Sequence, residues 1–234
     1  MNTSLKLLII ALVLLVGIGY ANFMHAQTEG FNVKSPTEKI ADSTTSFLNE
    51  VMQNAKKNPS KSIPRDLVCS AECFLVIPNI EVVESRGDFR GTGLLACRSD
   101  SLTNFTEPIY YDINNIKSFE QGGGGLIILL EDEDVVRTFL GAEMHLTSEN
   151  TSVGPIGKEA NTEIKSIIAY VKYGGQVLAG TDLSGSILEY ASRDTFNAYQ
   201  GTIVPIEILL NPRDVPPILR GFDSLINVWT RDCK

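Results

Sequence analysis

Histidine is nearly absent from the sequence, since only His25 and His145 occur in 234 residues. No Gly-x-Ser-x-Gly elbow is present either, so a serine hydrolase would have to use His145 as its base. That histidine lies on a segment of alternating polarity, which favours a structural or exposed role. No two carboxylates have a spacing that marks an acid–base pair. The sequence therefore predicts a protein that is not an enzyme and that uses no cofactor.

Positive charge is also scarce. The chain has 20 Lys and Arg residues against 28 Asp and Glu residues, a formal net charge of −8. An acidic chain is a poor non-specific binder of nucleic acid, so we exclude that class of partner. The same charge opposes attraction of the whole protein to anionic lipid. Any binding to such a lipid would therefore need a local basic patch.

Long hydrophobic runs are lacking except at residues 7–21, which follow Lys6. This run is shorter than the roughly 20 apolar residues that a membrane-spanning helix needs. It is typical of a secretory signal peptide within residues 1–26, cleaved after Ala21 or Ala26. An uncleaved anchor is the alternative. No cysteine lies near the end of the run, which excludes a lipobox, and both alternatives predict export to a periplasm or to the outside of the cell.

Cysteine is limited to Cys69, Cys73, Cys97 and Cys233. In an exported protein an even number of cysteines permits disulfides, and four cysteines allow three connectivities. A zinc site with four thiolates lacks its usual close paired spacings here. Free buried thiols are the third possibility, and the sequence leaves the three open.

Periodicity and turn residues predict an α+β fold, with an antiparallel sheet or a partly closed barrel flanked by helices. Ser35-Pro36-Thr37-Glu38 combines an N-cap, a first-turn proline and a capping-box glutamate, and it begins an amphipathic helix over residues 36–57. Its apolar face is expected to pack on the core, and contact with a lipid surface is the alternative. The expected strands begin at 108 and cover 126–130 and 141–148, and two hairpins are expected, one in 80–98 and one over 164–190 that is joined at Gly174-Gly175. The expected helices are a short one followed by an apolar strand in 63–78, one that begins after the acids at 131–134, a helix or turn that ends at 201, and a closing helix over 218–229. Residues 149–162 are expected to form a loop.

Basic residues concentrate in one place, between Lys56 and Arg65. Residues 34–65 hold six basic side chains against three acidic ones. Lysine and arginine beside an apolar face can hold phospholipid headgroups, each contributing about 1 kcal/mol near an anionic surface. Lysines at a helix C-terminus are also ordinary partners of the helix dipole. The candidate lipid-binding residues are Lys56, Lys57, Lys61 and Arg65.

Several short motifs, taken in order, resemble the SYLF domain, a lipid-binding module. They occupy residues 63–201 and comprise IPRDLVCSAECFLVIPNI from Ile63, Phe89-Arg90-Gly91-Thr92-Gly93-Leu94, Glu107-Pro108-Ile109, Gly154-Pro155-Ile156-Gly157, Gly180-x-x-Leu183-x-Gly185 and Asn197-Ala198-Tyr199-x-Gly201. The sequence departs from the family pattern at Glu81, Glu84, Asp88 and Phe105-Thr106, changes that remove positive charge and add negative charge. The resemblance implies lipid or membrane association without catalysis.

These observations predict four segments: 1–26 as the signal peptide or anchor, 27–62 as a leader with the amphipathic helix, 63–201 as the SYLF-like domain, and 202–234 as a C-terminal helical extension. The expected function is non-enzymatic binding of phospholipid at the cell envelope, in a periplasmic or secreted, membrane-associated protein. The alternative is an envelope scaffold that binds another protein.

Overall fold

The structure is a computed structural model that describes residues 34–85, 87–99, 105–117, 119, 124–157, 165–173, 179–210 and 213–233. The predicted signal segment and the Gly174-Gly175 turn lie outside these residues. A compact unit begins at Pro36. Its helices are α2 (Pro36–Lys57), α3 (Arg65–Ser70), α4 (Glu133–Gly141), α5 (Ser192–Tyr199) and α6 (Arg220–Thr230), with 3₁₀ turns η1 (Pro59–Lys61) and η2 (Pro205–Leu209). Within the described ranges, no helix combines the length and the apolar character that crossing a bilayer requires.

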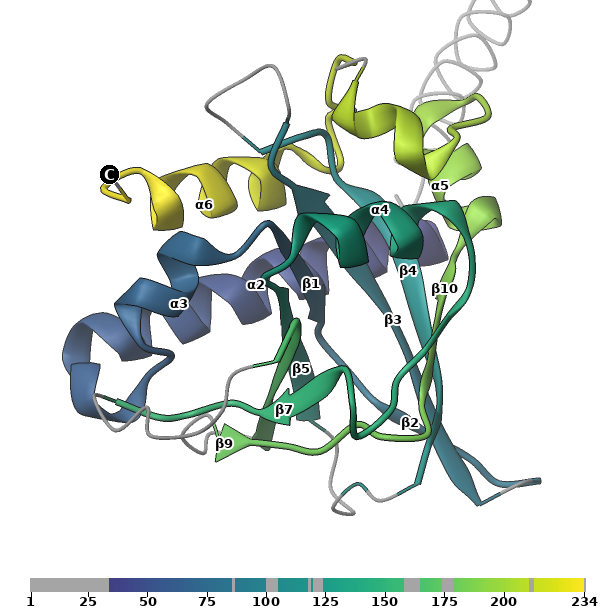
Figure 1. Cartoon of the computed structure of the whole chain (residues 1–234). Coiled ribbons are helices and arrows are strands. Elements are labelled where there is room, and N and C mark those ends of the chain that lie inside the picture. Colours follow the sequence, from purple (N-terminus) through teal and green to yellow (C-terminus); the bar gives the residue numbers. More distant parts are fainter. Residues whose placement is uncertain are drawn as a thin grey trace, which may run out of the picture. The chain divides into compact units, whose positions relative to one another are not determined.

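One curled, mixed sheet forms a half-barrel at the centre of this unit (Figure 1). The strands are β1 (Cys73–Ile77), β2 (Glu81–Val83), β3 (Asp88–Cys97), β4 (Ile109–Ile116), β5 (Gly124–Leu130), β6 (Met144–His145), β7 (Thr151–Val153), β8 (Ile167–Tyr173), β9 (Ala179–Gly180) and β10 (Ile187–Tyr190). Their order is β6-β10-β4-β3-β1-β5-β8-β7, with β2 added to β3 and β9 added to β8. All described pairings are antiparallel except β7 with β8. The predicted α+β class, with helices flanking a sheet, is confirmed.

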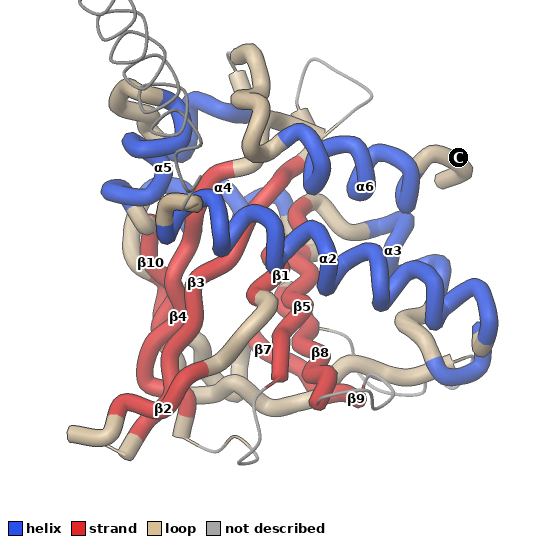
Figure 2. Tube along the Cα trace, turned by 180° about the vertical axis from the view of Figure 1, so that it is seen from behind, coloured by secondary structure: helices blue, strands red, loops and turns tan. Residues whose placement is uncertain are grey.

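Both faces of the central strands are buried, which explains their nearly continuous apolar sequences. Along β1, Leu75 and Ile77 enter one core while Phe74 and Val76 enter the other. The first core is covered by α4 and η2, and the second by α2, α3 and α6. Figures 1 and 2, seen from opposite sides, show α4 in front of the sheet in one view and α2 in front of it in the other.

Helix α2 lies on the sheet as an integral part of the fold. Its buried side chains include Phe47, Leu48 and Val51, which belong to the second core. The buried Lys172 of β8 reaches Glu50 with its Nζ atom 2.8 Å from Oε1. The expected packing of this helix on the core is confirmed. Most of its apolar face is therefore occupied inside the protein and is not available to a lipid surface.

The hairpin predicted over residues 164–190 is wrong in its second strand. Strand β10 pairs with β4 and β6. Within the described part of the predicted second strand, only the two-residue β9 pairs with β8. Between them the chain turns, because Ser186 donates its N–H to the carbonyl of Leu183 and Gly185 has φ +91°. The stretch Leu183–Ser186, expected inside a strand, is therefore a turn.

Two shorter expectations also need correction. The strand predicted over 141–148 is reduced to Met144–His145, since Gly141 still belongs to α4 and Ser148 begins a turn. The loop predicted over 149–162 contains β7, which pairs in parallel with β8. A three-residue edge strand has too little sequence to show a period, so its pairing was not visible in the pattern.

The four cysteines form two disulfides. Cys73 of β1 is joined to Cys97 of β3, and Cys69 of α3 is joined to Cys233, which follows α6. No cysteine is free. The structure thus selects one of the three connectivities, and the zinc and free-thiol alternatives are wrong.

Candidate functional site

A groove of about 870 Å³ opens where the C-terminal end of α2, the turn η1, α3 and the C-terminal end of α6 meet. Its apolar lining includes Met52, Ile63, Pro64, Val68 and Trp229. Its charged lining consists of Lys56, Arg65, Asp66, Arg231 and Asp232. It thus combines an apolar floor with a charged rim, the composition of a site for an amphipathic ligand.

The sequence at the end of α2 forms the first wall of this groove. Helix α2 ends at Lys57, and Pro59 begins the short turn η1, because proline supplies no N–H to continue a helix. The chain then reverses into α3 after Pro64, which has an extended backbone. This reversal brings Lys56 and Arg65 to the same groove.

The Gly-Pro-Ile-Gly motif supports this turn from a distant part of the sequence. Gly157 donates its N–H to the carbonyl of Ser62 at 3.0 Å. Its φ is +70°, and a Cβ there would lie 2.6 Å from the carbonyl oxygen of Ser60. A side chain at position 157 would therefore strain the backbone and clash with the turn.

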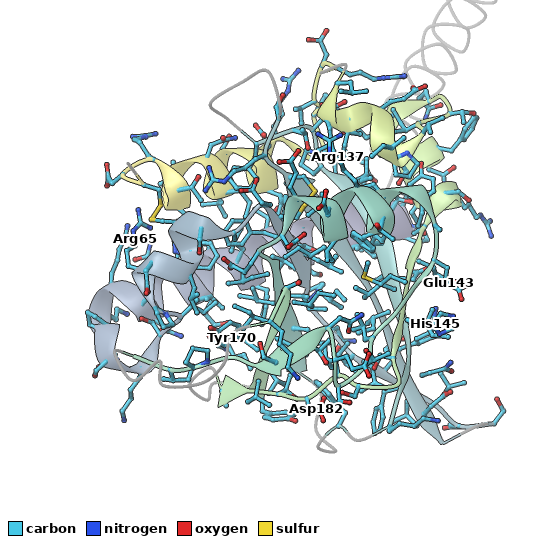
Figure 3. All side chains as sticks on the ribbon, in the orientation of Figure 1. Arg65, Arg137, Glu143, His145, Tyr170 and Asp182 are labelled. Carbon is cyan, nitrogen blue, oxygen red and sulfur yellow. A yellow bond between two sulfur atoms is a disulfide. The ribbon has the colours of Figure 1, made fainter. Side chains whose placement is uncertain are left out.

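Two links hold α6 against α3 on the opposite side of the groove. The Arg65 guanidinium donates from Nη1 to the carbonyl of Trp229. One turn further along α3, Cys69 is bonded to Cys233. Figure 3 shows Arg65 at the edge of the molecule where α3 and the end of α6 come together. These links fix the spacing between the two helices, so this wall is preformed.

The predicted lipid-binding residues lie around the groove in two groups. Lys56 and Arg65 line it, whereas Lys57 and Lys61 are exposed beside it and do not line it. None of the three lysines forms a salt bridge or side-chain hydrogen bond with any residue in the described part of the chain. The structure therefore brings half of the predicted set into the groove and leaves the other half on the adjoining surface.

Sequence reasoning missed the contribution of α6. Arg231 and Asp232 add one positive and one negative side chain to the rim, and Trp229 forms part of the floor. Trp229 is 9% exposed and its ring centroid lies 5.3 Å from that of Phe74. The pairing of Cys69 with Cys233 is the signal that would have placed Arg231 near Arg65, but the sequence left that pairing open.

Neither a hydrolase site that uses His145 nor a metal site is assembled among the described residues. The His145 side chain is 69% exposed, and Nε2 lies 3.0 Å from Oε1 of Glu143. The hydroxyl of Ser184 donates a hydrogen bond to the carboxylate of Asp182 at 2.6 Å and not to a histidine. This bond helps to hold the pKa of Asp182 below its usual range. Among the described residues, no group of three metal-ligating side chains comes together.

Other glycines of the motifs that resemble the SYLF domain serve close packing. A Cβ at Gly154 would lie 2.3 Å from the Tyr170 ring, and one at Gly180 would lie 2.2 Å from the carbonyl oxygen of Gly154. The two motifs therefore meet each other over β8. Their role in the fold is steric, because neither position leaves room for a side chain.

The chain matches no protein-family model, and no curated protein matches it. The resemblance to the SYLF domain rests on the short motifs and stays a prediction.

Proposed function

We propose that this protein is a non-enzymatic, SYLF-type domain that binds anionic phospholipid at the cell envelope. One observation supports this most strongly. The predicted cations Lys56, Lys57, Lys61 and Arg65 gather at one end of the molecule, beside the groove with its apolar floor. An anionic headgroup can approach such an end although the chain as a whole is acidic.

The magnitudes favour a modest and salt-sensitive interaction. Each lysine or arginine near an anionic surface contributes about 1 kcal/mol, so the four residues supply about 4 kcal/mol. The remaining acidic surface repels the lipid only over a distance of about 8 Å at physiological ionic strength. Membrane association through this end should therefore weaken as salt is added.

Vesicle flotation tests the proposal with the chain from Gln27 onward, which contains the whole compact unit. The protein should float with anionic vesicles at low salt and stay in the unbound fraction with zwitterionic vesicles. Equal recovery in the unbound fraction with both kinds of vesicle would contradict the proposal and leave the protein-binding scaffold as the better explanation.

Charge-reversal variants locate the surface. The triple variant Lys56→Glu, Lys57→Glu, Lys61→Glu should lose flotation. A matched control, Lys39→Glu, Lys117→Glu, Arg193→Glu, reverses three exposed charges elsewhere and produces the same net charge. If both variants lose binding equally, net charge rather than this surface governs the interaction.

A further inference from the structure

We infer that the groove binds a single-chain anionic amphiphile, one molecule at a time, with its acidic group among Lys56, Arg65 and Arg231 and its aliphatic chain over Met52, Ile63 and Trp229. This inference rests on the proposed function and deepens it, since it assigns the lipid a bound position inside the groove. The ligand class is a fatty acid or a lysophospholipid-like monoester.

The volume indicates one small ligand. The groove measures about 870 Å³, within the range of about 300–1,000 Å³ that is typical of sites for a single small molecule. A surface that only rests on a bilayer needs no such concavity. The apolar side chains on the floor remove an aliphatic chain from water, and each methylene that is buried strengthens binding.

The charges select an anionic headgroup. Three cations against two carboxylates line the groove, in a chain whose formal net charge is −8. Arg65 uses one donor for the carbonyl of Trp229. A guanidinium has five N–H donors, so the same side chain can also donate to a carboxylate or phosphate. Lys56 and Arg231 supply further positive charge in the lining of the same groove.

The preformed walls reduce the cost of binding. The Cys69–Cys233 disulfide and the bond from Arg65 to Trp229 hold one side of the groove, and the bond from Gly157 to Ser62 holds another, before any ligand arrives. A site that is already ordered loses little conformational entropy when it is filled. A short, flexible ligand can therefore bind with measurable affinity as a monomer.

Trp229 gives a direct readout, because it is the single tryptophan of the chain and lines the groove. Dodecyl phosphate and dodecanoate, each kept below its micellar concentration, should change the Trp229 fluorescence in a saturable way. Inorganic phosphate should produce no change. Dodecyltrimethylammonium, which has the same chain and a positive headgroup, should bind at least tenfold more weakly. The first two probes distinguish phosphate from carboxylate headgroups.

Two variants test the position of the ligand. Lys56→Glu with Arg231→Glu should weaken dodecyl phosphate binding at least tenfold, while Lys39→Glu with Arg193→Glu, which has the same net charge, should leave it unchanged. Unfolding curves of both variants show whether the fold is intact. In a second approach, Ala55→Trp adds bulk at the groove lining, and binding measured calorimetrically should be lost while Ala55→Ser retains it.

The outcomes separate this inference from the proposed function. Flotation with anionic vesicles but no response to monomeric amphiphiles would overturn the groove assignment and leave surface binding standing. If the protein neither floats with anionic vesicles nor responds to monomeric amphiphiles, the proposed function and the groove assignment are both overturned. Equal responses to the anionic and cationic probes would also overturn it. So would a fluorescence change that follows protein concentration alone, since a second copy of the chain would then occupy the groove.

Discussion

The strands and the helical end of the molecule each contain one disulfide, and the two covalent links differ in what surrounds them. Cys73 and Cys97 lie opposite each other on β1 and β3, fully buried in strands that are already paired along their length. Cys69 and Cys233 join α3 to the end of α6 across 164 residues, beside the groove. The first link reinforces contacts that would exist without it, whereas the second helps to form a wall of the candidate site.

The largest expected effect comes from the link across 164 residues. Replacing Cys69 and Cys233 by Ser should lower the free energy of unfolding by about 5 kcal/mol, because the unfolded chain gains the conformational freedom of a long loop. Urea unfolding under oxidising conditions measures this. The variant should also bind dodecyl phosphate more weakly, since the end of α6 is less firmly held.

Removing the strand disulfide should have a smaller effect on stability. The pair Cys73→Ala and Cys97→Ala opens a loop of 24 residues, for which loop closure accounts for about 3.5 kcal/mol. Binding in the groove should not change, because these residues pack in the core on the opposite face of the sheet from α2, α3 and α6. If this variant loses amphiphile binding as fully as the first, the contrast between the two disulfides is wrong.

A glycine substitution tests how closely the same two strands pack. A Cβ at Gly93 of β3 would lie 2.0 Å from the carbonyl oxygen of Val76, so Gly93→Ala should cost about 1–3 kcal/mol in unfolding experiments. Gly141, in the last turn of α4, has nothing within 4 Å of a Cβ. Gly141→Ala is the matched control and should be neutral or slightly stabilising. Equal losses in both variants would contradict the steric explanation.

The smallest expected effect concerns a buried acid on the helical side. Glu107 is 3% exposed, and neither carboxylate oxygen has a hydrogen bond of normal geometry among the described residues. Burial raises the pKa of Glu107, the backbone N–H groups of Glu107 and Arg213 and the positive charge of Arg213 oppose this change, and the charge of Asp223 adds the smallest contribution upward. Ionisation therefore destabilises the fold at neutral pH, and this cost disappears as the pH falls toward the usual glutamate value of about 4.3.

Glu107→Gln should consequently raise the free energy of unfolding at pH 7 by about 1 kcal/mol, the low end of the cost of an unpaired buried polar group. The gain should shrink when unfolding is repeated near pH 4. The exposed Glu149→Gln serves as the control and should show neither effect. A gain that is independent of pH would show that ionisation of Glu107 is not its cause.

Local signals in the sequence predicted the elements well where they were strong. The capping sequence at Ser35 marked the start of α2, and the acids before Val135 marked α4, where Asp132 accepts the N–H of Val135 at 3.0 Å. The partner of β10 could not be predicted, because alternating apolar residues show that a strand has a buried face but do not identify its neighbour. The turn at Gly185 redirects the chain from β8 toward β4 and β6.

The candidate site was predictable only in part, for a similar reason. The basic residues from Lys56 to Arg65 are close together in sequence, so their concentration was visible. Arg231 and Trp229 reach the groove through the fold, whereas Lys57 and Lys61, although close in sequence to Lys56, do not line it. The density of positive charge along the sequence shows which segment is basic. The groove beside that segment depends on contacts between helices that are distant in sequence, so it could not be predicted.

The packing of α6 against α2 has a consequence for the order of folding. The core on that face is completed by Phe222, Ile226 and Trp229, which lie more than 160 residues beyond the first buried positions of α2. Contacts between such distant segments form slowly, because a long loop must close before any stabilisation is gained. A chain in which α6 has not yet docked would leave the apolar residues of α2 and β1 open to water, and exposed apolar surface of this kind promotes aggregation.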